Sequence, residues 1–499
     1  MHRSPTAEAE VAQELAEVRP DLVSRYTAEL PGARAAVLTR LWRALAFEPL
    51  PWITGRVPDG EGLSLRLRDG RRLDGPAADP YATAGYVTVV RLDGTAYGDP
   101  ARLVTDLGVP HSDGLVAELD HSVASLALSR TGQPANPSNE WPATDWEWEQ
   151  RVVDGHPFHP NCRSRPGFSV AEQLAYGPEH RPLVGLGLLP VRAEECLVTG
   201  VWPDGMRDGR RLLIPVHPWQ AAHVLKRTGD EGPAAHPLMS LRTLALPDGG
   251  PHVKTALSAR LTSSVRDISV YSIGLSATLS AFAESLETHL DGLLHFTRTL
   301  GAATAGSPDL AAVLRESPQV YAGSGERVVP VAALATTGLP SRPAWLADFT
   351  RLSLTVGLRL LDLGVALEAH GQNLLVVLSA TGAPLRLVYR DLADIRVSPA
   401  RLARHGIPVP ELTGRIVTDD EIALRRKLFG ALVAGSLAGT AGSGAALGAA
   451  LETVVRDLPR TPDLVALLEN PVPAKALTLM RLSPGTPGDQ WAQLPNPLA

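Results

Sequence analysis

The residues best suited to chemistry lie in the segment LEAHGQNL at residues 367–374 and in Asp391, which follows after the length of one hairpin. Glu368, Asn373 and Asp391 are oxygen donors, and Mg²⁺ prefers oxygen ligands and often bridges protein carboxylates to nucleotide phosphates. These residues therefore predict the metal and phosphate end of an ATP site. A lone Glu or Asn is usually a cap or surface residue, but the whole set has the logic of a kinase catalytic loop with its metal-binding aspartate.

The phosphate loops of common kinases and P-loop enzymes are missing from the chain. The segment VGLGLL at residues 184–189 lacks a third glycine, and no G-x-x-x-x-G-K-[ST] pattern occurs. Any ATP site must therefore use another architecture. A kinase-like phosphotransferase remains an alternative at this point.

A group of cations and hydroxyls precedes this segment and consists of Ser240, Arg242, Lys254, Thr262 and Arg266. If residues 252–262 form one strand, Lys254 and Thr262 share its parity and point to one face. Two guanidinium forks and one point charge on a sheet face suit a polyanion, such as ATP together with a carboxylate substrate. The alternative is a solvated basic strand, which is more plausible for one of these residues than for the set.

Two histidine-proline segments lie further upstream. The first, GHPFHPNCRSR at residues 155–165, carries His156, His159, Cys162, Arg163 and Arg165. Its His-x-x-His-x-x-Cys spacing is similar to that of zinc sites, but no fourth ligand follows at a suitable spacing. The prolines predict an extended loop whose arginines suit phosphate or carboxylate capture; the alternative is a buried histidine loop with surface arginines. The second segment, IPVHPWQ at residues 214–220, on its own favours a packed corner.

Hydrophobic periodicity indicates which elements position these residues. Helical patterning covers residues 7–50 and 100–130, alternation typical of strands covers residues 61–94, and a polar, proline-rich connector covers residues 131–145. Short apolar runs between turn signals predict a mostly antiparallel sheet over residues 146–276.

The pattern becomes helical from about residue 277. The longest helix is expected over residues 343–369, so that its C-terminal end delivers the carboxylate and imidazole of LEAHGQNL. A hairpin with strands at residues 374–378 and 385–389 follows, and it ends just before Asp391.

Composition narrows the class of protein. With 499 residues, of which 44% are hydrophobic, the chain is long enough for about two to four lobes with real cores. A net charge of −6 gives no broad attraction to nucleic acid or anionic membranes. Two cysteines exclude a disulfide scaffold and, with an N-terminus that lacks an apolar signal region, predict a cytoplasmic protein.

The segment at residues 428–451 has no charged residue and is long enough to suggest a membrane span. Its small residues and the run GTAGSG at residues 439–444 would break a helix in the middle. Two buried helices joined by a glycine turn are therefore the favoured prediction.

The four clusters, in this order, resemble the IucA/IucC family, the NRPS-independent siderophore (NIS) synthetases. The matching pieces are GHPFHPNCRSRPGFS, IPVHPWQ, SLR…K…TSSVR and EAHGQN…YRD, which span residues 155–391. The resemblance implies an α+β fold shaped like a cupped hand and, commonly, a homodimer. We therefore expect a thumb-like lobe at 1–135, a fingers lobe with the antiparallel ATP- and carboxylate-binding sheet at 136–300, and a helix-rich palm lobe at 301–499. The part from about residue 390 would match the family's FhuF-like helical extension, and because it has no cysteine pair we expect no redox activity.

The resemblance implies two half-reactions. A carboxylate attacks the α-phosphate of ATP to give an acyl-adenylate and pyrophosphate, and an amine, or less often a hydroxyl, then displaces AMP. The expected partners are small molecules, with no nucleic acid and no membrane. Citrate, 2-oxoglutarate and a monoacylated acid remain open as the acid, with a weak preference for citrate because of the arginines, and the sequence does not indicate the amine.

Carried over residue by residue, the resemblance implies that the phosphate and carboxylate region is lined by Ser240, Arg242, Thr262 and Arg266. Lys254 would neutralise charge growing on the α-phosphate, and His370 would contact the acid or its adenylate. The groups expected to carry catalysis are Arg242, Lys254, Arg266 and His370.

The same resemblance assigns Mg²⁺ and the nucleotide phosphates to Glu368, Asn373 and Asp391, with Gln372 supporting their loop. The residues expected to close over the nucleotide are His156, His159, Arg163 and Arg165. The family often has lysine in place of Arg163, which keeps the charge with another geometry. A catalytically inactive homologue that acts as a binding protein is a further alternative, against which the intact set of site residues counts.

Overall fold

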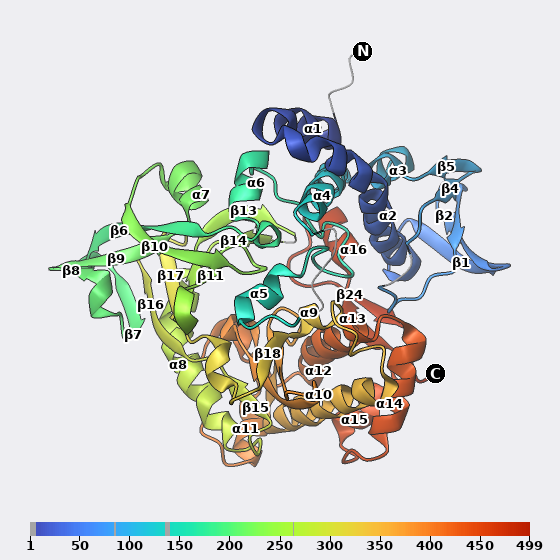
Figure 1. The fold of residues 1–499 in the computed structure, drawn as a ribbon. Coiled ribbons are helices and arrows are strands. Elements are labelled where there is room, and N and C mark those ends of the chain that lie inside the picture. The colour runs from blue at the N-terminus through green and yellow to red at the C-terminus, as the bar shows by residue number, and fades with distance from the viewer. Residues whose placement is uncertain (1–5, 84–85, 135–139, 263) are drawn as a thin grey trace.

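Three groups of elements meet at the centre of the computed structural model, which describes residues 6–83, 86–134, 140–262 and 264–499 (Figure 1). N-terminal helices and a small sheet lie on one side, a large sheet lies on the other, and a helix-rich C-terminal part lies beneath both. Each group has its own large hydrophobic cluster. The fold is therefore a mixture of helices and antiparallel sheets, as predicted, while the boundaries at 135 and 300 stay predictions.

The N-terminal group pairs helices with a five-stranded sheet in the order β1-β2-β3-β4-β5. Its elements are α1 (Ala7–Val18), α2 (Val23–Phe47), β1 (Ile53–Asp59), β2 (Gly62–Leu67), β3 (Arg72–Pro76), β4 (Val90–Leu92), β5 (Thr95–Tyr97), α3 (Pro100–Leu107) and α4 (Asp113–Thr131). Leu65, Leu67 and Leu73 are buried in one cluster with Trp42 of α2. The alternation in the sequence arises because one sheet face packs against this helix, and the helical and strand predictions for this region are confirmed.

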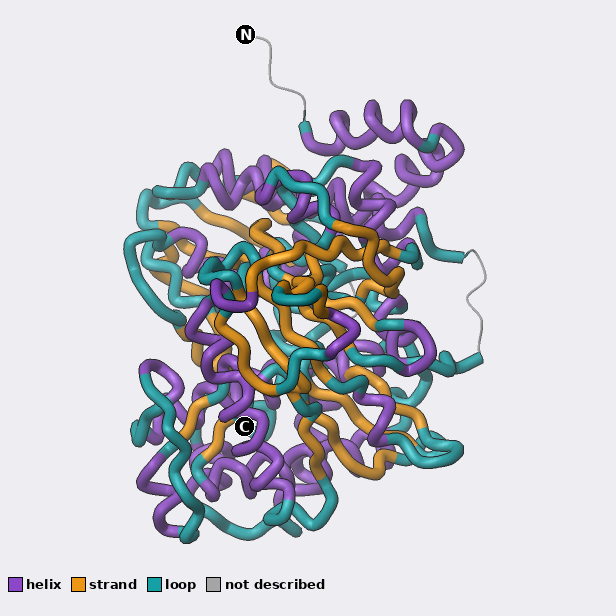
Figure 2. Tube along the Cα trace, turned by 90° about the vertical axis from the view of Figure 1, so that its left-hand side faces the viewer, coloured by secondary structure: helices purple, strands orange, loops and turns teal. Residues whose placement is uncertain are grey.

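The large sheet has nine strands, all paired antiparallel, in the order β7-β16-β17-β12-β11-β10-β6-β9-β8. They are β6 (Val184–Arg192), β7 (Leu197–Gly200), β8 (Arg207–Asp208), β9 (Arg211–Val216), β10 (Asp230–Pro237), β11 (Thr243–Ala245), β12 (His252–Thr255), β16 (Thr299–Thr304) and β17 (Ala311–Arg315). Figure 2 views the molecule from this side, with strands running across it above the helices of the C-terminal part. The antiparallel sheet is confirmed.

Helix was expected from about residue 277, and this was wrong in part. Helix α8 (Val270–Glu287) is followed by β15 (Leu294–Phe296), β16, β17 and β18 (Arg327–Pro330). Short apolar runs that are buried on both faces have no alternation, so periodicity cannot separate them from buried helix.

The strand expected over residues 252–262 is broken. It divides at Ala256 into β12 and β13 (Leu257–Leu261), and β13 pairs with β14 (Ser264–Arg266) in a separate two-stranded sheet. Lys254 and Thr262 therefore do not share one strand, and strand parity cannot place their side chains on one face.

The long C-terminal helix, α10 (Pro343–Leu363), ends earlier than expected. Gly364 adopts a left-handed φ of 106°, and its N–H bonds the carbonyls of Leu360 and Leu361. A Cβ at Gly364 would lie 2.8 Å from Cβ of Arg401, so this turn requires glycine. Glu368 and His370 consequently lie on a loop rather than at a helix end.

That loop runs from β19 (Val365–Ala366) into the hairpin of β20 (Leu374–Leu378) and β21 (Pro384–Tyr389), which confirms the predicted hairpin. The hairpin lies in a four-stranded sheet of order β15-β21-β20-β18. The smaller elements are α5 (Asp145–Gln150), α6 (Val170–Tyr176), α7 (Pro218–Gln220), α9 (Val331–Leu334), β22 (Arg396–Val397), α11 (Pro399–Arg404), α15 (Pro462–Glu469), β23 (Val472–Lys475), α16 (Leu477–Leu482) and β24 (Trp491–Leu494).

The uncharged segment at 428–451 forms buried helices joined by a glycine turn, as predicted. Helix α12 (Glu421–Ala431) continues through a π-helix (Leu432–Leu437) into α13 (Ala438–Ala441), and α14 (Gly444–Val455) follows after Gly442 at a bend of 114°. Among the described helices none alone is long and apolar enough to cross a membrane, and this bent pair meets that test only when its two arms are counted together.

Candidate functional site

The large sheet and the C-terminal hairpin meet at an ion pair between Lys254 and Asp391. Lys254 Nζ lies 2.6 Å from Asp391 Oδ2, and the two side chains are 12% and 30% exposed. Burial lowers the pKa of Lys254 to about 8, although the Asp391 charge opposes this. Burial acts to raise the pKa of Asp391, but Lys254 and Arg315 outweigh it and hold that pKa well below its usual range. The structure thus joins two clusters that the sequence separates by 137 residues.

Three arginines surround this pair. Burial lowers the pKa of Arg242 and of Arg315 to about 10 in spite of the nearby Asp391 charge. Burial likewise lowers the pKa of Arg266, against the charges of Asp391 and Glu368. The Asp391 charge therefore acts on all four cations, and the excess of positive charge around it suits a polyanion.

Arg315 was not predicted from the sequence. It ends β17, where it pairs in register with His252 of β12, two residues from Lys254. A lone arginine after an apolar run carries no signal of its own, and only the β12–β17 register reveals that it belongs to the cluster.

Strained backbone marks the turns of the site. Leu241, Thr262 and Asp391 have positive φ values of 61°, 58° and 74°. Such a conformation costs about 1–3 kcal/mol for each residue and persists only where neighbours enforce it. At Leu241 the neighbours do so: Arg242 Nη1 donates to the carbonyls of Arg266 and Asp267 at 2.5 and 2.7 Å. The turn that carries Ser240 and Arg242 is thereby tied to β14.

His370 presents one ring nitrogen to the site. Its Nδ1 accepts the N–H of Gln372 at 3.3 Å, so Nε2 carries the proton. Burial lowers the pKa of His370 below its usual value, although the Glu368 charge opposes this. A neutral imidazole with a free Nε2–H is a hydrogen-bond donor for an anionic substrate.

His156 and His159 repeat this arrangement. Each Nδ1 accepts the N–H of the residue two positions on, at 3.1 and 3.0 Å. Desolvation by the surrounding protein lowers the pKa of both histidines, that of His159 to about 3. His159 is buried, whereas His156 keeps part of its surface exposed. The His370 imidazole lies close enough to lower the pKa of His156, and the Arg266 guanidinium lowers that of His159, so this loop borders the site.

The zinc alternative gains no support. In the ranges that the structure describes, no three His, Cys, Asp or Glu side chains converge as metal ligands. Cys162 Sγ instead lies 3.7 Å from Ser122 Oγ in the interior.

Arg163 and Arg165 lie away from the converging groups. Arg165 donates to Glu179 at 2.6 and 3.0 Å, and Arg163 lies 3.6 Å from the same carboxylate. Their side chains are 5% and 2% exposed and that of Glu179 is 0% exposed. Arg163 Nε also donates to the Val153 carbonyl at 2.6 Å. These arginines therefore stabilise the interior of the loop and do not lie at the surface, and their expected contact with the nucleotide stays a prediction.

Glu368 is held by two lysines that were not predicted. Its Oε1 accepts from Lys475 at 2.9 Å and from Lys427 at 3.3 Å. Burial acts to raise the pKa of Glu368, but the two lysines lower it to about 2. Both lysines use Oε1, and no donor among the described residues bonds Oε2, so one oxygen of Glu368 stays available to a metal ion.

Asn373 and Asp391 also keep oxygens that could serve the expected metal role. They flank the paired ends of β20 and β21, where Arg390 N–H donates to the Asn373 carbonyl at 3.0 Å. Among the described residues no donor bonds the Oδ1 atom of either side chain. A carboxylate and a carboxamide at one strand end suit a Mg²⁺ that is held mainly by phosphate oxygens. The Gln372 carbonyl accepts from Arg390 at 3.0 and 2.8 Å, which braces the loop.

The His217 segment is a packed corner, as its sequence alone predicted. Trp219 stacks on Phe168 at 4.8 Å, and its Nε1 donates to the Gly167 carbonyl at 3.1 Å. Gln220 bonds Ser258 from the same turn.

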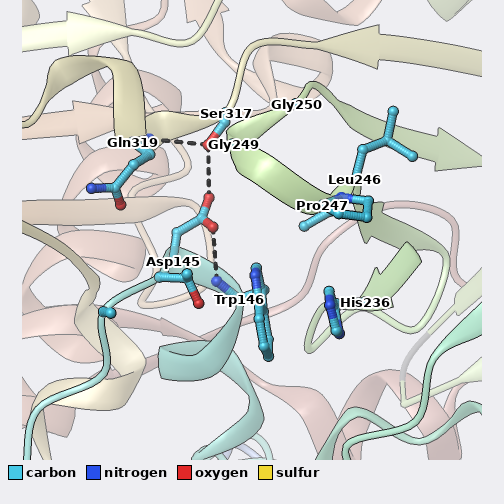
Figure 3. A pocket seen from close by; sticks show the side chains of 12 residues that line it. Asp145, Trp146, His236, Leu246, Pro247, Gly249, Gly250, Ser317 and Gln319 are labelled. Atoms are coloured by element: carbon cyan, nitrogen blue, oxygen red, sulfur yellow. Dashed lines mark hydrogen bonds between the residues drawn. The ribbon is translucent and has the colours of Figure 1, made fainter. Parts of the chain in front are cut away.

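A cavity of about 410 Å³ lies beside α5, near the basic cluster (Figure 3). Asp145 accepts from Ser317 at 3.0 Å and pairs with His252 at 2.8 Å. The Trp146 and His236 rings stack with a spacing of 3.7 Å and form a flat wall. The cavity is linked to β12 through the pair of Asp145 with His252, which lies two residues from Lys254 on that strand.

Two family models match the chain. The IucA/IucC family model matches residues 144–336, and the model of the ferric iron reductase FhuF-like transporter matches residues 343–486. The FhuF-like part therefore begins with α10, earlier than the expected position near residue 390.

Named relatives are ligases and synthases. The citryl-spermidine/3,4-dihydroxybenzoyl-citryl-spermidine:spermidine ligase of Bacillus anthracis is 26% identical over 50% of this chain and 51% of its own length. Staphyloferrin A synthase of Staphylococcus aureus is 22% identical over 58% of this chain and 59% of its own length. The chain spans 51–62% of the length of the first curated relatives that it matches.

Solved structures share the fold over nearly the whole chain. The petrobactin biosynthesis protein AsbB of Bacillus anthracis has a TM-score of 0.77 at 18% identity, covering 99% of this chain and 98% of its own. The ATP-bound aerobactin synthetase IucA of Klebsiella pneumoniae has a TM-score of 0.74 at 20% identity, covering 93% and 99%. Residues 144–336 of the chain therefore belong to the IucA/IucC family by the family-model match, and the chain as a whole shares the fold of the solved siderophore synthetases.

Proposed function

We propose that this protein is an ATP-dependent ligase that adenylates citrate or a related di- or tricarboxylic acid and joins it to an amine or a hydroxyl in siderophore or metal-chelator biosynthesis. The names of the relatives support this, since they include citrate–amine ligases and an ATP-bound synthetase. The partners are small molecules, and the proposal includes a cytoplasmic homodimer.

One observation carries the proposal. The Asp391 carboxylate acts on all four of Lys254, Arg242, Arg266 and Arg315. The nearby Glu149 is paired with Arg390, and Glu368 is paired with Lys427 and Lys475, so the cluster holds more positive than negative charge. ATP and a polycarboxylate together are strongly anionic and would balance that excess. A purely structural cluster would instead contain about one carboxylate for each buried cation, because an uncompensated buried charge is costly.

In the first half-reaction a carboxylate oxygen attacks the α-phosphorus, the bond from that phosphorus to the bridging oxygen breaks, and pyrophosphate leaves. Negative charge grows on the α-phosphate oxygens in the transition state. Lys254 and Arg266 would stabilise this charge from fixed positions, which accelerates the step more than it strengthens ground-state binding.

In the second half-reaction the amine nitrogen attacks the acyl carbon, AMP leaves with the oxygen that the acid contributed, and the amine loses one proton. With Nδ1 occupied by Gln372, His370 would donate through Nε2–H to the acid or its adenylate. When bound, Mg²⁺ would neutralise phosphate charge, and Asn373 and Asp391 would hold it.

Product analysis tests the proposal. The protein is incubated with ATP, Mg²⁺, hydroxylamine and a panel of acids that includes citrate and 2-oxoglutarate. We expect a hydroxamate together with AMP and pyrophosphate. Formation of ADP would indicate the kinase-like phosphotransferase instead. The absence of hydroxamate, AMP and pyrophosphate with citrate, 2-oxoglutarate and succinyl acids would contradict the proposal.

A further inference from the structure

A buried carboxylate, Glu149 of α5, joins the two halves of the site without belonging to either. Its side chain is 1% exposed. Oε2 accepts the N–H of Met239, the residue before Ser240, at 3.0 Å. Oε1 lies 2.5 Å from Nη1 of Arg390, the residue before Asp391.

Arg390 extends this connection into the loop. Its side chain is 4% exposed, and its Nε and Nη2 donate to the Gln372 carbonyl at 3.0 and 2.8 Å. The series Met239–Glu149–Arg390–Gln372, in which an ion pair joins hydrogen bonds at either end, therefore runs from the sheet-side turn to the LEAHGQNL loop. These segments lie far apart in the sequence, so Glu149 links them only in the folded chain.

Glu149 also supplies a negative charge between two buried arginines, Arg315 and Arg390. Arg315 lies close to both Arg390 and Glu149. Two buried guanidinium groups repel each other, and the Glu149 carboxylate offsets that repulsion. Removing the charge would let Arg390 and Arg315 move apart, which would displace the loop that Arg390 braces through the Gln372 carbonyl.

We propose that Glu149 is a positioning residue that holds the turn at Ser240–Arg242 in register with the hairpin that carries His370 and Asp391. The proposal rests on the proposed function. Cations from the sheet and the imidazole from the hairpin must act on one acyl phosphate, and a misplacement of about 1 Å in such an arrangement can cost about 10²-fold in rate.

Single variants test this role at a temperature where all proteins are folded. The substitution Glu149→Gln replaces one carboxylate oxygen, an acceptor, with an amide NH₂ donor and removes the negative charge. In Glu149→Asp, the shorter side chain cannot reach both partners. We expect the kcat of acid-dependent pyrophosphate release to fall at least about 10-fold in both, with the KM for ATP within about 3-fold, because the sheet-side cations remain.

A double variant separates positioning from stability. Replacing both members of a buried pair often restores stability, whereas replacing one leaves an unpaired charge. In Glu149→Gln/Arg390→Met we expect Tm to recover relative to Glu149→Gln while kcat stays reduced. The matched control is Asp463→Asn, which breaks the buried Arg401–Asp463 pair of 2.6 Å and should lower Tm with kcat unchanged.

Hydrogen exchange gives a readout that needs no substrate. In Glu149→Gln we expect the backbone amides of residues 239–243 and 370–374 to exchange faster together, and in Asp463→Asn neither segment should change. Unchanged exchange in both segments, a kcat within about 3-fold of the unaltered protein, or a double variant that regains kcat along with Tm would overturn the inference. If the unaltered protein forms AMP with no acid, the proposed function fails while the exchange result still decides the role of Glu149.

Discussion

Arginines cluster twice in this molecule, and the two clusters differ in how their charge is compensated. At the sheet–hairpin junction, Arg242, Arg266 and Arg315 share Asp391 with Lys254. In the loop at residues 155–165, Arg163 and Arg165 are satisfied by Glu179 and by backbone carbonyls. Both sequences looked suited to anions. The structure separates them, because only the first cluster has cationic charge left for a ligand.

The strongest test of this difference between the two clusters is to remove a cation from the first one. Arg266→Ala should lower acid-dependent pyrophosphate release at least about 10³-fold, because transition-state charge loses a fixed donor. His370→Ala should also abolish adenylation. Pyrophosphate release measures both, and an unchanged Tm is the control. A variant with near-normal turnover would remove that residue from the site.

Removing the carboxylate instead of a cation tests the second cluster. Glu179→Gln leaves two buried guanidinium groups without their carboxylate and should cost about 3 kcal/mol of unfolding free energy. Denaturant unfolding measures this loss. The kcat of the folded fraction should stay within about 3-fold; a selective loss of ATP binding without loss of stability would show that this loop belongs to the nucleotide site.

Lys254→Ala sharpens the assignment of the first cluster. Its charge is needed most in the transition state, so kcat should fall about 10²-fold, or about 2.7 kcal/mol, while the Kd for ATP changes by only a few-fold. Single-turnover kinetics and calorimetry separate the two quantities. An equal loss in both would make Lys254 a ground-state binding residue.

The remaining test concerns the packed corner, where a buried histidine has only a structural role and no effect on turnover is expected. Burial lowers the pKa of His217 to about 3. The unfolded chain therefore binds a proton first as the pH falls below about 6.5, and stability decreases by about 1.4 kcal/mol per pH unit from this residue down to its folded pKa. His217→Asn, whose Oδ1 can accept the Trp219 N–H, should make the pH dependence of unfolding between pH 6.5 and 4.5 shallower. An unchanged slope would mean that His217 is not held neutral.

Local patterns predicted much of this structure. The hairpin after LEAHGQNL, the N-terminal sheet and the bent uncharged helices follow from turn residues and periodicity in short windows. The helix before the loop was extended too far because Gly364 was read as part of an apolar helix, although its left-handed backbone and its contact with Arg401 end the helix there.

The missed site residues depend on long-range contacts. Arg315 joins the cluster only through strand register, Lys427 and Lys475 reach Glu368 from the C-terminal part, and Glu149 acts through Arg390. A short window holds no sign of such partners. Charge compensation, which distinguishes Arg163 from Arg266, is likewise a property of the folded molecule, because the compensating carboxylate is distant in sequence.

The most direct test of an α-phosphate site follows one oxygen atom. An acid that supports turnover is labelled with ¹⁸O in its carboxylates and incubated with ATP, Mg²⁺ and hydroxylamine, and the products are analysed by mass spectrometry. We expect one ¹⁸O atom in AMP, because the acid oxygen attacks the α-phosphorus and leaves with it when the amide forms. Label in inorganic phosphate, accompanied by ADP, would place the attack at the γ-phosphorus and contradict the proposed site.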